Sequence, residues 1–125
     1  MIVVDASALM ALLLREPGSD VVAERISKSV ISAVNLAEVL ARMSRERISA
    51  RTLVPKLTAL GLAIVDFDQA QAVIAGEIRE HARGQGVGLA DCCCMALALH
   101  QAWPVLTADR LWAKLGFDID VRLIR

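Results

Sequence analysis

The sequence predicts one α/β domain, a three-layer sandwich in which helices flank a central, mostly parallel sheet of five strands. Short apolar runs of strand length alternate along the chain with longer segments that have helical spacing. A length of 125 residues suits a single domain, and a hydrophobic content of 56% excludes intrinsic disorder. We therefore expect one compact core and a single domain over residues 1–125.

The expected strands are short apolar runs of the kind that β-branched residues favour. Ile2-Val3-Val4 is the clearest example, because all three residues are β-branched and none is polar. In chain order, the strands are expected at residues 2–4, 30–31, 62–65, 104–106 and 121–124.

Helices are expected in the intervals between these strands. Pro17-Gly18 breaks the first helix, which begins directly after the first strand. Ser32 and Asp68 are placed to cap two later helices, and Gly61 is placed to end another. In chain order, the helices are expected at about residues 5–16, 19–28, 33–43, 50–60, 69–83, 89–101 and 111–115.

Four acidic residues occupy positions near one edge of this sheet. Right-handed crossovers place the carboxyl ends of parallel strands along the same edge, and sites in such sheets gather there. Asp5 follows the first strand and Asp109 follows the fourth. Glu38 and Asp91 lie on helices that begin beside that edge. Four carboxylates in one cleft repel one another, and a hard divalent cation such as Mg²⁺ or Mn²⁺ relieves that repulsion.

Each acid also has an ordinary structural interpretation. Asp5 and Asp109 are placed to cap the helices that follow them. Glu38 precedes Arg42 by four residues, the spacing of an exposed helical ion pair worth about 0.3–0.5 kcal/mol. Asp91 lies in a helix that is apolar on every side, and a lone buried carboxylate is costly unless it is paired or metal-bound. A functional role is therefore favoured most clearly for Asp91.

Composition excludes some classes of nucleic-acid binder. The 14 basic and 14 acidic residues cancel, so the chain is not a polycation that coats nucleic acid, although a local basic patch is compatible with this balance. Aromatic residues make up only 3% of the chain, which argues against a base-stacking platform.

Cysteine usage and hydropathy indicate a soluble, cytoplasmic protein. Successive helix residues point about 100° apart, so Cys92-Cys93-Cys94 cannot converge on one metal and is better explained by packing in a buried helix. We expect no secretory leader and no membrane span, because the apolar stretches are short or interrupted by polar residues.

Four segments, taken together and in this order, resemble the PIN domain, and specifically the short bacterial toxins of the VapC family. The resemblance covers essentially the whole chain. Its segments are Val3-Val4-Asp5-Ala6-Ser7, Ser32-Ala33-Val34-Asn35-Leu36-Ala37-Glu38-Val39, Gly88-Leu89-Ala90-Asp91 and Pro104-Val105-Leu106-Thr107-Ala108-Asp109. The fourth segment departs slightly from the family, because Leu111 and Trp112 follow where an aromatic residue often comes sooner.

The resemblance implies a PIN-like fold and a metal-dependent endoribonuclease, the toxin of a toxin–antitoxin pair. The family's acids correspond to Asp5 and Asp91 as direct ligands of one or two Mg²⁺ or Mn²⁺ ions. Glu38 and Asp109 then complete the coordination shell of the metal, directly or through water. In this family a metal-activated water attacks the RNA phosphodiester in line. Three polar residues match family positions that orient these acids or the waters: Ser7, Asn35 and Thr107.

Basic residues and apolar surface suggest where partners bind. The segment 42–56 carries a local charge of +4, which fits either an RNA-binding surface or a solvated helical face. Its basic residues are Arg42, Arg45, Arg47, Arg51 and Lys56, and Arg110 and Lys114 form a second candidate. The family resemblance implies a homodimer silenced by a small antitoxin. The high apolar content fits surface hidden by such a partner, which we expect on segments 19–28 and 42–60.

Two other functions fit parts of the pattern. A phosphoacceptor domain also places an Asp after a strand, but a receiver needs two adjacent acids and a late Lys, and a phosphatase needs a second Asp where Ser7 stands. A PIN-like domain that has lost catalysis and acts as a binding module is opposed by the complete set of acids, and it stays open as an alternative.

Overall fold

In the computed structural model, which describes all 125 residues, five short strands form one wholly parallel sheet. The strands are β1 (Ile2–Val4), β2 (Ser29–Ser32), β3 (Ala63–Val65), β4 (Val105–Thr107) and β5 (Val121–Leu123). Their order across the sheet is β3-β2-β1-β4-β5. The predicted α/β class and five-stranded parallel sheet are therefore confirmed.

β1 lies at the centre of the sheet, where the progression of the chain across the sheet reverses. From β1 the chain moves outward through β2 to β3, and it then returns to the other side of β1 to form β4 and β5. Val3 pairs with Val30 of β2 on one side and with Val105 of β4 on the other. Open parallel sheets bind ligands outside the carboxyl ends of their strands at such a reversal. Here that position is the crevice above β1 and β4.

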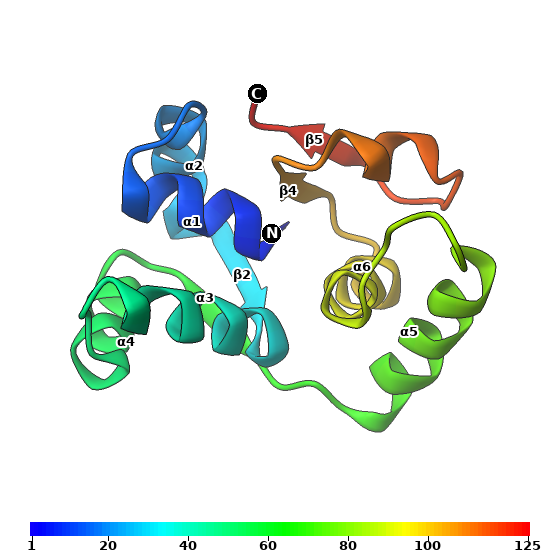
Figure 1. Ribbon diagram of the computed structural model, residues 1–125, viewed down its shortest axis with the longest axis horizontal. Coiled ribbons are helices and arrows are strands. Elements are labelled where there is room, and N and C mark those ends of the chain that lie inside the picture. The colour runs from blue at the N-terminus through cyan, green and yellow to red at the C-terminus, as the bar shows by residue number, and fades with distance from the viewer.

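Helices cover both faces of the sheet. They are α1 (Ala6–Leu14), α2 (Ser19–Arg25), α3 (Ala33–Arg45), α4 (Ala50–Ala59), α5 (Gln69–His81) and α6 (Leu89–Gln101), with two 3-10 helices, η1 (Ile26–Lys28) and η2 (Arg110–Lys114). In Figure 1, α1 to α4 lie on the left of the picture and α5 and α6 on the right. The predicted three layers are thus present, with the strands between two helical groups.

The strands divide their side chains between two cores, as strands buried on both faces do. Val4 and Ile31 face the core formed with α1 to α4. Val3 and Val30, their neighbours in sequence, face the core formed with α5 and α6. Every residue of β1, β2 and β4 is buried, so these three strands form a rigid base beneath their carboxyl ends.

The expected helix caps are formed. The Ser32 hydroxyl accepts the backbone N–H of Val34 at 3.2 Å, and Asp68 Oδ1 accepts that of Gln71 at 2.9 Å. Gly61 ends the turn after α4 with a φ of +96°, a conformation that suits glycine. Two expected helices differ in type, because 3-10 geometry replaces α-helix at η1 and throughout η2. Short 3-10 turns are common at helix ends and in connections.

α6 is buried along most of its length, as its apolar sequence predicts. Its three cysteines are free and buried. Burial raises the pKa of Cys94 well above its usual range, so this thiol stays protonated and packs as a small apolar group. None of the helices combines the length and the apolar composition that crossing a membrane requires.

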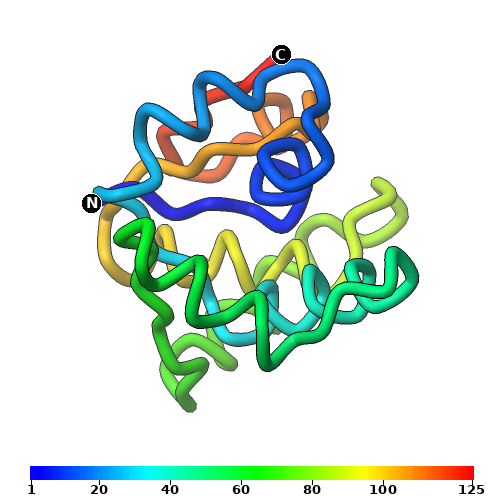
Figure 2. Tube along the Cα trace, turned by 90° about the vertical axis from the view of Figure 1, so that its left-hand side faces the viewer, coloured from blue at the N-terminus to red at the C-terminus, as the bar shows by residue number.

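The C-terminal residue is tied to the turn between α1 and α2. Arg125 donates from Nη1 to the carbonyl of Pro17 at 2.8 Å. Figure 2 shows the C-terminal strand running beside this turn. Gly18 has a φ of +94°, and a Cβ added there would meet the carbonyl oxygen of Ile124 at 2.6 Å.

We expect Gly18→Ala to lower the free energy of unfolding by about 1–3 kcal/mol, because it strains the backbone and displaces the C-terminal strand. Gly76→Ala is the matched control, since Gly76 lies inside α5 with no atom within 4 Å of an added Cβ. It should raise the free energy of unfolding by about 0.5–1 kcal/mol. Urea unfolding measures both, and a shift of the two midpoints in the same direction would contradict this account.

Candidate active site at the carboxyl edge of the sheet

Asp5 lies at the carboxyl end of β1, where it is only 3% exposed. Its Oδ2 accepts hydrogen bonds from the hydroxyls of Ser7, at 2.6 Å, and Thr107, at 2.9 Å. The backbone N–H of Ala108 donates to the Ser7 hydroxyl at 3.0 Å. The backbone N–H of Asp109 donates to the Thr107 hydroxyl at 3.0 Å. Because each hydroxyl oxygen accepts an amide proton, its own proton is directed toward Asp5.

Both hydroxyls donate to the same carboxylate oxygen, and Oδ1 of Asp5 accepts no hydrogen bond from the protein. Asp5 occupies the N-cap position of α1, but its side chain makes no capping hydrogen bond. The interpretation of Asp5 as a helix cap is therefore wrong. The carboxylate is held toward β4 instead, with one oxygen left for another ligand.

Asp109 and Asp91 are both fixed by backbone amides. Asp109 caps η2, because its Oδ1 accepts the N–H of Leu111 at 3.0 Å. The capping interpretation of Asp109 is thus confirmed, and its second oxygen remains available. Asp91 is partly buried in the first turn of α6, where its Oδ2 accepts the N–H of Gly88 at 3.1 Å.

Asn35 ties α3 to the start of α6. It is fully buried, and its Nδ2 donates to Glu38 Oε2 at 2.9 Å and to the carbonyl of Ala90 at 3.0 Å. Ala90 immediately precedes Asp91, so one amide group sets the position of Glu38 relative to Asp91. The amide oxygen of Asn35 is buried and has no donor in the protein.

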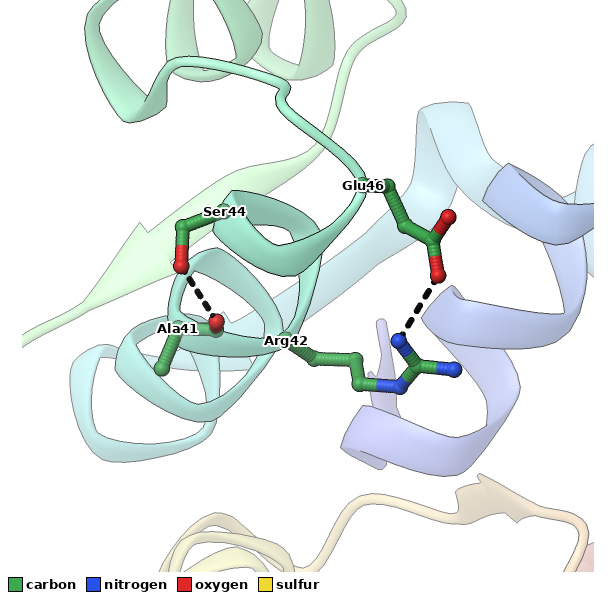
Figure 3. A network of polar contacts seen from close by, with 4 residues as sticks. All are labelled: Ala41, Arg42, Ser44 and Glu46. Atoms are coloured by element: carbon green, nitrogen blue, oxygen red, sulfur yellow. Dashed lines mark hydrogen bonds and ion pairs between the residues drawn. The ribbon is translucent and has the colours of Figure 1, made fainter.

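Glu38 does not form the ion pair with Arg42 that its spacing allows. Arg42 instead donates from Nη1 to Glu46 Oε1 at 2.8 Å, one helical turn in the opposite direction. Figure 3 shows this contact at the end of α3. The interpretation of Glu38 as half of an ordinary ion pair with Arg42 is therefore wrong.

The acids act on one another electrostatically. Burial raises the pKa of Asp5 to about 6, the hydroxyls of Ser7 and Thr107 oppose this shift, and the charges of Asp91 and Glu38 add to it. Burial likewise raises the pKa of Asp91, against the Gly88 N–H, and the charge of Asp109 adds to that rise. The three ion pairs of the structure involve none of these four acids. Their negative charge is therefore left without a basic partner.

The four acids do not form a complete metal-binding site as they stand. No group of three or more His, Cys, Asp or Glu side chains is arranged so that it could hold a metal ion. The chemistry of the donors nevertheless fits a hard divalent cation, which prefers carboxylate oxygens. Asp5 has a free oxygen, the acids lack a counter-charge, and the buried oxygen of Asn35 lacks a donor. The acids would have to move closer together to share one ion.

The basic residues expected to contact RNA are all exposed. Arg42 and Arg45 lie at the end of α3, and Arg47 and Arg51 lie in and after the following turn. Arg110 begins η2, directly after Asp109. Their side chains are free to reach a ligand, but only Arg42 lines a cavity together with residues of the acidic site.

Several groups that orient the acids were not predicted from the sequence. They are backbone groups, namely the N–H groups of Gly88, Ala108 and Asp109 and the carbonyl of Ala90. Backbone donors carry no side-chain signature, so residue types do not reveal them. Met10 and Leu14 were also missed, because in sequence they look like ordinary apolar positions of α1, whereas they line the cavity beside Ser7 and Glu38.

The sequence profile of the PIN domain family matches residues 2–118. The chain therefore belongs to the PIN domain family, as its four motifs indicated. No curated protein matches the chain.

Solved structures with the same fold include toxins of toxin–antitoxin systems. A DNA-bound VapBC from Salmonella typhimurium is 18% identical, with a TM-score of 0.76 over 99% of this chain and 98% of that one. A toxin–antitoxin complex from Klebsiella pneumoniae is 16% identical, with a TM-score of 0.78 over 100% and 98%. VapC20 from Mycobacterium tuberculosis, a toxin that cleaves the sarcin–ricin loop, is 19% identical, with a TM-score of 0.70 over 98% and 99%. At these identities the likeness shows the fold.

The raised pKa of Asp5 predicts a pH-dependent stability in the presence of a chelator. Between about pH 4 and pH 6 the folded chain binds more protons at Asp5 than the unfolded chain, so the free energy of unfolding falls as pH rises. The loss amounts to about 3 kcal/mol once the pH exceeds the folded pKa. Asp5→Asn should remove the part of this dependence that comes from Asp5 and so make it clearly weaker, as urea unfolding across the pH range would show.

Asp118→Asn serves as the control, because Asp118 is exposed and precedes β5 at the opposite edge of the sheet. That variant should keep the wild-type pH dependence. A wild-type protein whose stability rises with pH over this range would contradict the assignment of Asp5 as an unpaired buried acid.

Proposed function

We propose that this PIN domain is a metal-dependent endoribonuclease and acts as the toxin of a toxin–antitoxin pair. The observation that carries the proposal is the buried carboxylate of Asp5, which is held by two hydroxyls, lies within electrostatic range of two further acids, Asp91 and Glu38, and has no basic partner. A buried acid in this state destabilises the fold unless a cation offsets its charge. Cleavage of RNA by the structural neighbour VapC20 supports the choice of substrate.

The acidic residues would share a divalent cation. Asp5 and Asp91 would hold Mg²⁺ or Mn²⁺ directly, and Glu38 and Asp109 would complete the shell directly or through water. When bound, the cation supplies the charge that lowers the pKa of water and offsets the negative charge of the phosphodiester.

The chain's own residues would orient this chemistry. Ser7 and Thr107 fix one oxygen of Asp5, so that the other is left free for a ligand. Asn35 holds Glu38, and the Gly88 N–H holds Asp91 at the start of α6. Neither histidine belongs to this set, since His81 and His100 are exposed on α5 and at the end of α6. Proton removal from the attacking water is therefore left to the acids and the cation.

The proposed biological partners follow from the structural neighbours. The proteins from Salmonella typhimurium and Klebsiella pneumoniae were solved as toxin–antitoxin complexes. We infer a small antitoxin as the partner of this chain, and a homodimer in the cytoplasm as its working form. The exposed Leu60, directly after α4, and Val73 of α5 are available for such contacts, at 51% and 56% exposure.

One observation favours a second function. Because no three acids are spaced to hold an ion, a PIN-like binding module without catalysis is the alternative. The phosphoacceptor alternative has no such support. The chain belongs to the PIN domain family, and the hydroxyls of Ser7 and Thr107 already donate to one oxygen of Asp5.

We expect Asp5→Asn and Asp91→Asn each to reduce Mg²⁺- or Mn²⁺-dependent RNA cleavage by about 100-fold or more, because each removes a ligand of the cation. Gel analysis of a labelled RNA measures the rate, and Asp118→Asn should cleave at the wild-type rate. Cleavage that survives both site variants or a chelator would contradict the proposal, and a wild-type chain that binds RNA without cleaving it would favour the binding module.

Asn35→Ala should weaken the apparent affinity for Mg²⁺ in the cleavage assay by about 10- to 100-fold, because Glu38 and the start of α6 lose their common anchor. Saturating Mg²⁺ should restore most of the turnover. Ser29→Ala tests for mere destabilisation, since Ser29 is fully buried and donates to the Arg25 carbonyl at the opposite edge. Equal effects of the two variants on Mg²⁺ affinity would show that Asn35 has no positioning role.

A further inference from the structure

A cavity of about 330 Å³ lies at the amino edge of the sheet, the edge opposite to the acids. Ile2, at the start of β1, and Pro104, directly before β4, both line it. Strand geometry places roughly 10 Å between Ile2 and Asp5, because the length of β1 separates them. The volume falls in the range of small-molecule pockets. This cavity is therefore separate from the acidic site.

The charged lining of the cavity is mainly basic. Arg25 ends α2, Lys28 ends η1, and Arg122 lies in β5. Glu24 contributes the only carboxylate, so the lining side chains carry a local charge of +2. The basic groups come from both sides of β1, since η1 leads into β2 and β5 lies beyond β4. A hollow with this excess of positive charge attracts anions.

The basic groups of the cavity keep donors that the protein does not use. The three ion pairs of the structure include neither Arg25 nor Lys28, and the Glu24 carboxylate takes part in none of them. Arg122 donates from Nε and Nη2 to a single oxygen of Asp120, at 3.1 and 2.8 Å. Its Nη1 is left without a protein partner. An anion in the cavity would therefore meet two guanidinium groups and one ammonium group with free N–H donors.

The backbone that carries Arg25 and Lys28 is anchored to the sheet. The buried hydroxyl of Ser29 donates to the carbonyl of Arg25 at 2.7 Å. Ser29 also pairs with Ile2 across β2 and β1, and Figure 2 shows the N-terminus beside the turn that leads into β2. The basic end of α2 is thus held next to the start of β1 before any ligand arrives. Such preorganisation lowers the entropic cost of binding.

We propose that this cavity binds a small phosphate-bearing anion, with the phosphate groups at Arg25, Lys28 and Arg122. Guanidinium and ammonium groups donate charge-assisted hydrogen bonds to phosphate oxygens. Met1 and Pro104 line the apolar part, which would contact a nucleoside attached to the phosphate. A small ligand fits better than an RNA strand or an acidic peptide, because the basic groups surround one hollow of limited volume. This proposal does not depend on the ribonuclease function.

Isothermal titration calorimetry in the presence of a chelator tests the proposal, because the acids repel an anion when no cation is bound. ADP and pyrophosphate should bind at one site with a Kd between about 1 µM and 1 mM, the range expected for three charge-assisted contacts. Tighter binding of ADP would identify a nucleoside phosphate as the ligand, and equal binding would identify an inorganic anion. Adenosine that binds as well as ADP would contradict the proposal.

Variants locate the bound anion. Arg25→Ala together with Lys28→Ala should weaken ADP binding by about 100-fold or more, because two charge-assisted contacts are lost. Glu24→Gln should strengthen it by about twofold to fivefold, since the carboxylate repels the phosphates. Arg79→Ala together with Arg83→Ala is the matched control, because it removes the same charge from exposed positions in and after α5. That double variant should bind ADP as the wild type does.

RNA cleavage separates this proposal from the proposed function. With Mg²⁺ present, the variant that lacks Arg25 and Lys28 should cleave RNA at the wild-type rate, because the cavity lies at the opposite edge from the acids. Slower cleavage by this variant alone would assign the cavity to the RNA strand and overturn the proposal, as would equal ADP binding by the two double variants. A wild type that cleaves no RNA but binds ADP would refute the ribonuclease function and support the anion site.

Discussion

The constraint on which the site depends is the burial of Asp5 without a basic partner. A carboxylate at the end of a central strand loses most of its hydration, and two hydroxyl donors offset only part of that cost. The donors are themselves oriented by backbone amides of the turn after β4. Asp5 is therefore coupled to the register of β1 and β4, the two strands that flank the reversal of the sheet. This uncompensated charge is the physical basis of our proposal that a cation binds beside Asp5.

The other acids depend on contacts between elements that are distant in sequence. Asn35 joins α3 to the start of α6, so that Glu38 and Asp91 are positioned by one buried amide. The charges of these acids raise the pKa of Asp5, although their side chains do not form a closed ligand set. Both observations describe one arrangement, in which the acids are near enough to repel and too far apart to coordinate without a cation to draw them together.

The sequence predicted the elements well because their signals are local. The caps at Ser32 and Asp68 and the alternation of strands and helices need only neighbouring residues. Side-chain partners were harder to predict. Arg42 has an acid four residues away on each side, so spacing alone cannot decide between Glu38 and Glu46. Likewise, the residue type of Asp5 allowed a cap, and only the approach of Thr107 from β4 shows that its carboxylate is held elsewhere.

The central claim is that the carboxyl edge of this sheet gathers a divalent cation between Asp5 and Asp91. The most direct measurement is anomalous diffraction from crystals of the wild-type chain soaked in Mn²⁺. The account predicts one or two anomalous peaks in the crevice above β1 and β4, with oxygens of both carboxylates as ligands. A crevice without manganese, or with the carboxylates of Asp5 and Asp91 turned away from each other, would contradict it.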